Sequence, residues 1–332
     1  MTTTLKAVLA SGLLLASSVA TAETIERDIC VFDIAGKVGP TMAAMQDWRT
    51  EAMNWGLDAN LKVYTNESVV AEDLKAGVCD AALMTGIRAR QFNTYAGTLD
   101  SIGAIPTMEH MKIALQVLAH PNSADKLTAN SYEVMGIAPI GAAYIFVNDR
   151  RVNTLAKAAG KKVAVLDYDP TQAKLVAAAG ATPVPSDITN FAGKFNNGVV
   201  DVIAAPLVAY NVLELYKGLE PDGGIIDYPL VQLSIQLIAK GDRFPEEMAQ
   251  TSREYFYNSL DQVLEQVERE ASVVDDKWWV DIPDKDKQEY EVMMQDARDQ
   301  MRNEGHYDPD MLDLLRKVRC KLNSSRAECT GA

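Results

Sequence analysis

Several polar and aromatic side chains follow apolar runs of the chain or stand on later apolar runs. The earlier ones are Asp33, Lys37, Tyr64, Asn66, Thr85, Arg88 and Arg90. The later ones are Tyr144, Asp167, Tyr168, Pro206, Tyr210, Gln232 and Gln236. A guanidinium such as that of Arg88 suits a bidentate contact to a carboxylate. We therefore treat this set as candidate ligand-binding residues.

These candidates also have structural interpretations. Arg88 and Arg90 could pair only with surface acids, and tyrosines near strand ends often pack in a core or between lobes. Asp169 precedes a proline, which is typical of a helix N-cap. Asp80 and Asp201 open their strands at the opposite end, so we expect structural roles for both.

The sequence carries no motif of covalent or metal catalysis. It has no G-x-S-x-G, no HExxH and no glycine-rich phosphate loop. It has no C-x-x-C, and His110, His120 and His306 form no metal-ligand pattern. We expect no catalytic residue, no metal and no cofactor.

A phrase that occurs twice predicts the elements that position the candidates. "KAGVCDAALMTG" spans residues 75–86, and "FNNGVVDVIAAP" spans residues 195–206. Each ends a β-α-β-α-β pattern, the first beginning near residue 29 and the second near residue 161. Such an order predicts parallel strands with right-handed crossovers. Ligands of open parallel sheets bind at the carboxyl ends of the strands, which is why residues after the strands are the candidates.

Helix boundary signals support this order. Helices ending at Gly56, Gly77 and Gly180 have glycine where a left-handed cap is common. Another helix is expected over residues 187–198 with Asp187 as its N-cap. Apolar runs over 132–150 and 228–244 are predicted to cross between the two repeats. A single long amphipathic helix is expected over 245–271, followed by a charged helical region.

The first 22 residues read as a secretory signal peptide. They have one Lys, an apolar stretch from Ala7 to Ala20 and an Ala-Thr-Ala ending. The stretch is shorter than the roughly 20 residues that span a bilayer, and no Cys follows the cleavage site. We expect an exported mature chain that begins at Glu23 and does not insert into the membrane.

Charge and cysteines agree with export. The chain has a formal net charge of −14, which argues against nucleic acid and anionic lipid surfaces as partners. Its four cysteines are Cys30, Cys79, Cys320 and Cys329. In an oxidising compartment an even count predicts two disulfides. Sequence proximity favours Cys320 with Cys329, leaving Cys30 with Cys79 at the starts of neighbouring strands; buried free thiols are the alternative.

The stretch "LAKAAGKKVAVLDYDPTQAKLVAAAGATPVPSDITNFAGKFNNGVVDVIAAP" resembles the periplasmic solute-binding proteins of TRAP transporters, the DctP type. That family has a similar "KIRV" strand, a helix ending "GA-PVP" and a "GVVDG-ENP" strand. The chain looks most similar to a divergent, AdeT-like branch. The resemblance implies an α/β, two-lobed periplasmic-binding-protein fold of type II. Each lobe would be a mostly parallel sheet flanked by helices, with a long connecting helix and a helical C-terminus.

The chain departs from the family at two positions. The family's Arg in "KIRV" and Asn in "ENP" contact a substrate carboxylate, and this sequence has Ala164 and Ala205 there. We therefore expect a smoother, more apolar pocket that suits a bulkier, more hydrophobic or cationic ligand.

The resemblance gives a domain plan and a function. We expect a signal peptide over 1–22, lobe I over 23–145 with a return segment near 235–260, and lobe II over 146–234. Residues 245–332 would form the helical region packing across both lobes. The implied function is capture of a small molecule between the lobes in the periplasm and its delivery to a membrane permease. Two alternatives are an envelope or efflux accessory that acts by protein contact and an enzyme on the same fold.

Overall fold

The computed structural model describes residues 24–329, so the expected signal peptide lies outside the described residues. The strands are β1 Ile25–Phe32, β2 Leu57–Tyr64, β3 Ala81–Thr85, β4 Thr128–Ala129, β5 Tyr132–Val147, β6 Lys162–Leu166, β7 Thr182–Ser186, β8 Val202–Pro206, β9 Gly224–Ile226, β10 Val231–Lys240 and β11 Trp279–Val280. The helices are α1 Pro40–Ala52, α2 Glu67–Ala76, α3 Gly86–Ala89, α4 Thr94–Gly97, α5 Met108–Ala119, α6 Ala124–Leu127, α7 Leu155–Ala158, α8 Pro170–Ala178, α9 Phe191–Asn196, α10 Ala209–Val212, α11 Tyr216–Leu219, α12 Glu246–Asn258, α13 Leu260–Ala271, α14 Asp284–Asn303 and α15 Pro309–Leu322. Short 3₁₀ turns lie between several of them.

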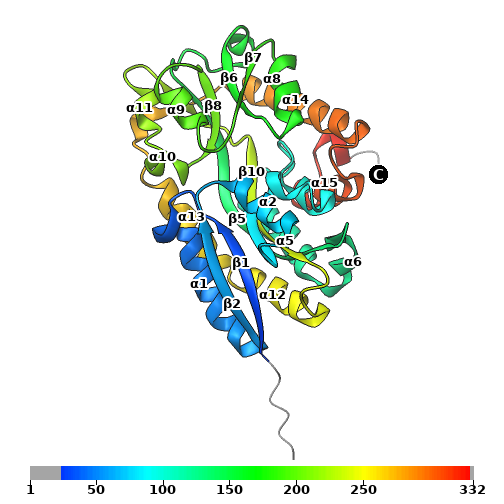
Figure 1. The fold of residues 1–332 in the computed structure, drawn as a ribbon. Helices are drawn as coiled ribbons and strands as arrows, with labels where there is room; N and C mark the ends of the chain where they lie inside the picture. Colours follow the sequence, from blue (N-terminus) through cyan, green and yellow to red (C-terminus); the bar gives the residue numbers. More distant parts are fainter. Residues whose placement is uncertain (1–23, 330–332) are drawn as a thin grey trace, which may run out of the picture.

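The strands form two α/β lobes joined through the middle of a continuous sheet. The strand order is β2-β1-β3-β10-β5-β8-β6-β7. We call the part around β1, β2 and β3 lobe I and the part around β6, β7 and β8 lobe II. Figure 1 shows lobe I in the lower half of the molecule and lobe II in the upper half. The two-lobed α/β fold predicted from the sequence is confirmed.

The repeated phrase corresponds to equivalent places in the two lobes. In lobe I, β1 pairs in parallel with β2 and β3, which gives the expected order 2-1-3. In lobe II, β6 pairs in parallel with β7 and β8 in the same manner. Gly56, Gly77 and Gly180 all have positive φ angles after their helices, as the caps required. The strands and helix ends of each lobe could therefore be located from local sequence patterns.

Strands β5 and β10 run from one lobe into the other. They are antiparallel along most of their length, and β10 also pairs with β3 while β5 also pairs with β8. Their register shifts opposite Leu233 and Ser234, where β5 has an extra residue. Gly141 lies at this bulge with φ +94°, a backbone conformation that glycine adopts without strain. Both crossing segments that the sequence predicted are confirmed.

Two helix boundaries differ from the prediction. The expected long helix is divided into α12 and α13 at Ser259, whose backbone angles of −84° and 0° leave the α region. The phenyl ring of Phe256 lies against Gly136 of β5, so close that a Cβ at position 136 would overlap it. Helix α9 begins at Phe191 with Asn190 before it. Asp187 instead accepts hydrogen bonds from the backbone N–H and hydroxyl of Thr189 in the preceding turn.

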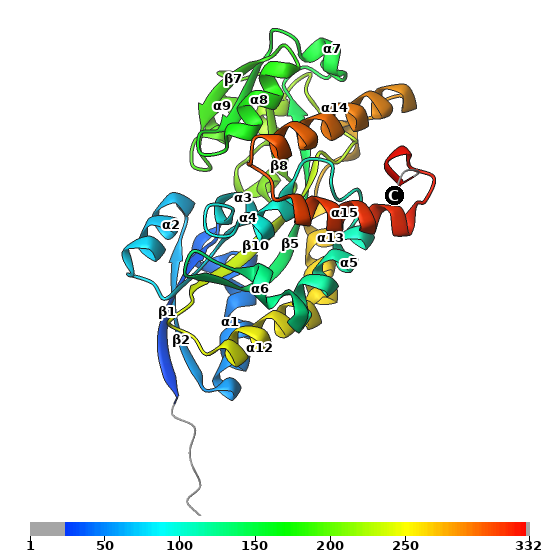
Figure 2. The same ribbon diagram turned by 90° about the vertical axis from the view of Figure 1, so that its right-hand side faces the viewer.

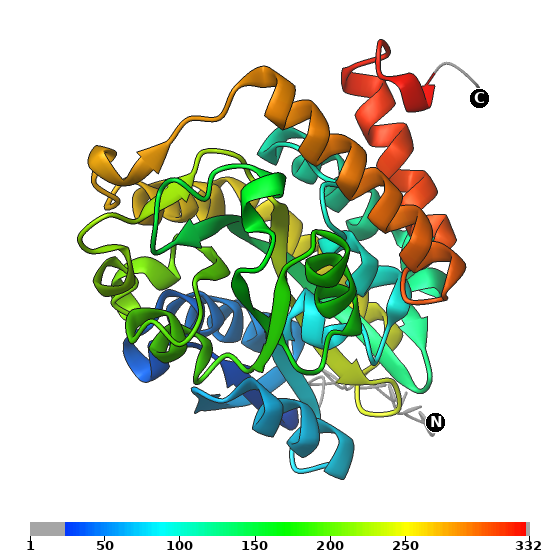
Figure 3. The same ribbon diagram turned by 90° about the horizontal axis from the view of Figure 1, so that it is seen from above.

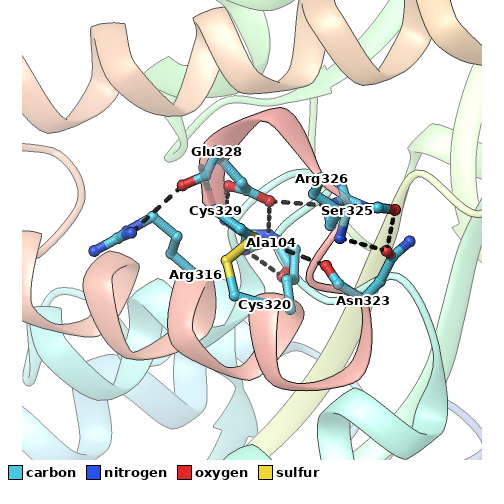
Figure 4. Close-up of a disulfide and its surroundings, with 9 residues drawn as sticks. Ala104, Arg316, Cys320, Asn323, Ser325, Arg326, Glu328 and Cys329 are labelled. Atoms are coloured by element: carbon cyan, nitrogen blue, oxygen red, sulfur yellow. Dashed lines mark hydrogen bonds and ion pairs between the residues drawn. A yellow bond between two sulfur atoms is a disulfide. The ribbon is translucent and has the colours of Figure 1, made fainter. Parts of the chain in front are cut away.

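Both predicted cysteine pairs are present. Cys30–Cys79 joins β1 to the residue two positions before β3, with a Cα–Cα distance of 5.8 Å, and is buried beneath α2. Cys30 does not open its strand as expected, because β1 begins at Ile25. Cys320–Cys329 ties the tail to α15, with a Cα–Cα distance of 5.6 Å. Figure 4 shows Glu328 beside this disulfide, where it pairs with Arg319 and Arg326.

The C-terminal helices lie along one side of the molecule. Figure 2 shows α14 beside lobe II and α15 beside α5 of lobe I. Viewed from above, the orange α14 leads into the red α15 at the edge of the fold (Figure 3). Met311 and Leu315 of α15 are part of the lobe I core. Among residues 24–329, no helix is long and apolar enough to cross a membrane.

Candidate functional site: the cleft between the lobes

A cavity of about 670 Å³ lies between the lobes. Lobe I contributes α1 and the ends of β1 and β3, and lobe II contributes β6, α8 and β8. Strands β5 and β10 and helix α13 complete the wall. Its volume is in the range of small-molecule binding sites. The cavity therefore lies where the carboxyl ends of the strands of both lobes face one another.

Most of the lining is aliphatic or aromatic. Lobe I presents Trp48 and Leu83, and lobe II presents Leu166 and Phe191. The two alanines Ala43 and Ala44 of α1 face the cavity and are exposed to it. An apolar ligand group that enters this cavity would leave water for contacts with hydrocarbon side chains. Its burial would favour binding by roughly 25 cal/mol for each Å² of apolar surface.

A glutamine supplies a polar point in this wall. Gln232 of β10 lines the cavity and is only 5% exposed. Its Oε1 has no hydrogen-bond partner. A buried amide oxygen without a partner is costly, so a hydrogen-bond donor placed there would be favoured.

A buried carboxylate joins the two lobes. Glu67, at the start of α2 in lobe I, accepts a hydrogen bond from the backbone N–H of Thr85 (2.7 Å). It also accepts one from the hydroxyl of Tyr168 in lobe II (3.1 Å). Burial raises the pKa of Glu67, and the Thr85 contacts and the Arg88 charge act in the opposite direction. Burial also raises the pKa of the Tyr168 phenol.

Arg88 lies beneath the Tyr168 ring. Its guanidinium carbon is 3.3 Å from the ring centroid, and its Nε is 3.5 Å from Oε2 of Glu67. Only 10% of the Arg88 side chain is exposed, and it does not line the cavity. Stacking and the carboxylate charge partly compensate the burial of this cation, whose Nε makes no hydrogen bond.

The second arginine of α3 is engaged in a similar way. Arg90 Nη1 lies 3.5 Å from Oδ1 of Asp169 in lobe II, and its Nε donates to the carbonyl of Gly97. Its guanidinium carbon is 4.9 Å from the Tyr307 ring centroid. Asp169 also caps α8 through the backbone N–H of Thr171, as its position before Pro170 predicted.

Asp100 is a buried acid in the cleft wall. Its carboxylate accepts hydrogen bonds from the backbone N–H and hydroxyl of Ser234 on β10, at 3.0 and 2.6 Å. Burial raises the pKa of Asp100 to about 7, although the Ser234 bonds and the Arg90 charge lower it. A Cβ at Gly86 would lie 2.5 Å from both Asp100 and Ser234, so only glycine fits there.

The candidates from the sequence divide into two groups. Those that line the cavity are Asp33, Thr85, Tyr144, Tyr168, Pro206 and Gln232. Those outside its lining are Lys37, Tyr64, Asn66, Arg88, Arg90, Asp167, Tyr210 and Gln236.

Several of these have local structural partners. Asp33 accepts hydrogen bonds from the backbone N–H groups of Ala35 and Met42, and burial raises its pKa. Asn66 caps α2. Tyr210 is 5% exposed in the lobe II core. Gln236 donates to the carbonyl of Ala96.

The two alanine positions also differ from each other. Ala164 of β6 lines the cavity. Ala205 of β8 is 1% exposed and faces the lobe II core, while Ala204 and Pro206 line the cavity. The expectation that Ala205 smooths the pocket wall is therefore wrong, because strand alternation turns its side chain inward. Asp80 and Asp201 bind backbone N–H groups at the far strand ends, as expected.

Sequence reasoning missed Glu67 and Asp100. Glu67 reads as an ordinary acid in the first turn of a helix, where it complements the helix dipole. Asp100 reads as a loop residue. Neither position carries a local signal of burial, because the groups that bury them come from distant segments.

Comparison with known proteins assigns the chain to a family. The sequence profile of the family described as "Solute-binding protein AdeT 1/2" matches residues 32–332. The chain belongs to this family. It is 45% identical over 299 residues to the probable solute-binding protein AdeT1 of Acinetobacter baumannii, covering 90% of this chain and 98% of that protein. It is 28% identical over 233 residues to the probable solute-binding protein AdeT2 of the same organism, covering 70% of this chain and 98% of that protein.

Solved structures share the fold of this solute-binding protein at low identity. A TRAP periplasmic solute-binding protein from Desulfovibrio salexigens, with bound orotic acid, matches with a TM-score of 0.75 and 15% identity. The match covers 90% of this chain and 99% of that one. A second, from Haemophilus influenzae with bound L-gulonate, matches with a TM-score of 0.74 and 11% identity, covering 88% and 99%. The resemblance to TRAP solute-binding proteins inferred from the sequence is confirmed.

Proposed function

We propose that this solute-binding protein captures a small molecule in the cleft between its lobes and delivers it to a membrane transporter. The observation that carries the proposal is the apolar cavity lined by both lobes and bordered by β5 and β10. Two strands between lobes permit hinge closure around a ligand. The Tyr168–Glu67 bond would then be one of the contacts that hold the closed form.

We further propose that the protein acts in the periplasm and does not chemically convert its ligand. The expected signal sequence and the family's solute-binding proteins support a periplasmic location and a permease as the partner. Glu67, Asp100 and Asp169 each accept a hydrogen bond from the backbone, and among the described residues of the lining no nucleophile is seen paired with a base. Binding without chemical change is therefore the function that the geometry favours.

The test is recovery of the natural ligand. We would purify the chain from the bacterial envelope, denature it and identify released small molecules by mass spectrometry. We expect a molecule near one equivalent that remains unchanged when incubated with fresh protein. Conversion of that molecule to a product would favour the enzyme alternative instead.

A further inference from the structure

The clearest unexplained feature of the cleft is its charge. Of the described residues that line it, Arg269 is the single basic one. The acids among the lining residues are Asp33, Asp47, Asp100, Asp169 and Glu270. Arg269 is 60% exposed on its side chain, lies 3.8 Å from Glu265 and donates to Gln266. No buried cation therefore faces the cavity among the residues that the structure describes.

Two arginines lie close by but are sequestered. Arg88 is covered by the Tyr168 ring and paired with Glu67. Arg90 is paired with Asp169 and bonded to a backbone carbonyl. Each of these guanidinium groups therefore already has a carboxylate of the protein beside it.

We propose, resting on the function proposed above, that the ligand is an apolar molecule without an acid group that donates a hydrogen bond to Gln232. A carboxylate in this cavity would be desolvated, and the one basic residue among the described lining residues, Arg269, is too exposed to compensate it well. A neutral apolar molecule avoids this cost. An ammonium group is also desolvated, but the acids of the lining can offset its charge. The unpartnered Oε1 of Gln232 is covered in this structure, so the side-chain amide must turn toward the cavity to accept a hydrogen bond from such a ligand.

The first experiment compares three ligands with one apolar body and different head groups. These are 4-phenylbutylamine, 4-phenylbutan-1-ol and 4-phenylbutanoate, titrated calorimetrically at about 0.15 M salt to screen the net charge. We expect the amine and the alcohol to bind at least roughly tenfold more tightly than the carboxylate. Equal or tighter binding of the carboxylate would overturn the inference and leave solute capture intact.

Further compounds distinguish a failure of solute capture from a failure of the proposed ligand preference. Succinate and galacturonate are included as polar acids. Binding of either of them in place of the phenylbutyl series would overturn the inference alone. Binding of none of these compounds, nor of the neutral fluorescent probe N-phenyl-1-naphthylamine, would count against both proposals.

A variant tests the polar contact. Gln232→Leu should weaken binding of the amine and alcohol by roughly tenfold, because the hydrogen-bond acceptor is lost. The matched control is Gln288→Leu, an exposed glutamine of α14 outside the cavity, which should bind as the wild type does. Equal affinities of the two variants would refute the role of Gln232. Circular dichroism and melting temperature would establish that both variants fold.

Discussion

Tyr168 connects the two lobes through its hydroxyl group and its ring. It stands between β6 and α8, covers Arg88 with its ring and donates to Glu67 in α2. Glu67 has no exposed surface, so its oxygens depend on protein donors. Loss of a donor there leaves a buried carboxylate oxygen with weaker compensation.

Tyr168→Phe should lower the free energy of unfolding by about 1.5–3 kcal/mol, the range for hydrogen bonds to charged groups. Chemical denaturation at neutral pH measures this. The control is Tyr216→Phe, whose hydroxyl bonds the exposed Glu214 within lobe II and should change stability by about 0.5 kcal/mol or less. Similar losses in both variants would contradict the interlobe role of Tyr168.

Asp100 gives the protein a specific pH dependence. Its folded-state pKa of about 7 is above its ordinary value of 3.8, so the folded state holds a proton that the unfolded state releases. The stability contributed by this group is complete below pH 3.8 and is lost as the pH rises through about 7.

The Asp100→Asn variant has no carboxyl group at this position and so lacks its pH dependence. The stability of the wild type relative to this variant should fall between pH 4 and pH 7, by at most about 1.4 kcal/mol per pH unit. Denaturation curves at several pH values measure the difference. A difference between the two proteins that does not change with pH would show that Asp100 titrates normally.

Among the secondary-structure elements, the crossing strand β5 contains a bulge that depends on one glycine. Gly141 occupies the bulge of β5 at φ +94°, and a Cβ there would lie 3.0 Å from Val267 of α13. The strand that joins the lobes therefore requires a residue at position 141 that can adopt a positive φ angle.

Gly141→Ala should destabilise the protein by about 1 kcal/mol, because a side chain disfavours this backbone conformation. Gly193→Ala is the control. Gly193 lies within α9 with open space around it, and alanine there should be neutral or stabilising by up to about 1 kcal/mol. Thermal unfolding of the two variants measures these changes in stability. A loss of stability seen only in Gly193→Ala would contradict this account of the bulge.

The two disulfides should differ in their effect on stability. They close loops with sequence separations of 49 and 9 residues. Chain entropy predicts a loss of about 4 kcal/mol for Cys30→Ala/Cys79→Ala and about 3 kcal/mol for Cys320→Ala/Cys329→Ala. Denaturation of each double variant measures these values. A larger loss from the C-terminal pair would contradict the loop-length argument.

Sequence predicted the elements better than the site. Glycine caps, alternation and the repeated phrase depend on neighbours in the chain, so β1 to β3 and β6 to β8 could be located. The division of the long helix at Ser259 could not, because α12 and α13 pack on a strand distant in sequence. The inward side chain of Ala205 likewise depends on the strand's orientation in the folded lobe.

The arrangement of the whole molecule explains why the residues of the cleft were only partly foreseen. Strand ends indicated Tyr168, and the returning strand indicated Gln232; both residues line the cavity. Glu67 and Asp100 become buried only when lobe II, β10 and α2 meet. Pairing across lobes is a property of the assembled fold and has no signature in a local stretch.

The central claim is that a small molecule binds in the cavity between the lobes. The most direct measurement is a thermal-shift screen of residues 23–332 with amines, alcohols, carboxylates, sugars and amino acids in large excess. A ligand at about 100 times its dissociation constant should stabilise the wild type by roughly 2.7 kcal/mol. The same screen is run on Ala44→Trp, which fills the cavity from α1, and on Ala76→Trp, an exposed site outside it.

We predict that a compound raises the melting temperature of the wild type and of Ala76→Trp but not that of Ala44→Trp. An equal shift in all three proteins would place the binding site elsewhere. The absence of a shift with every compound would contradict solute capture in this cleft.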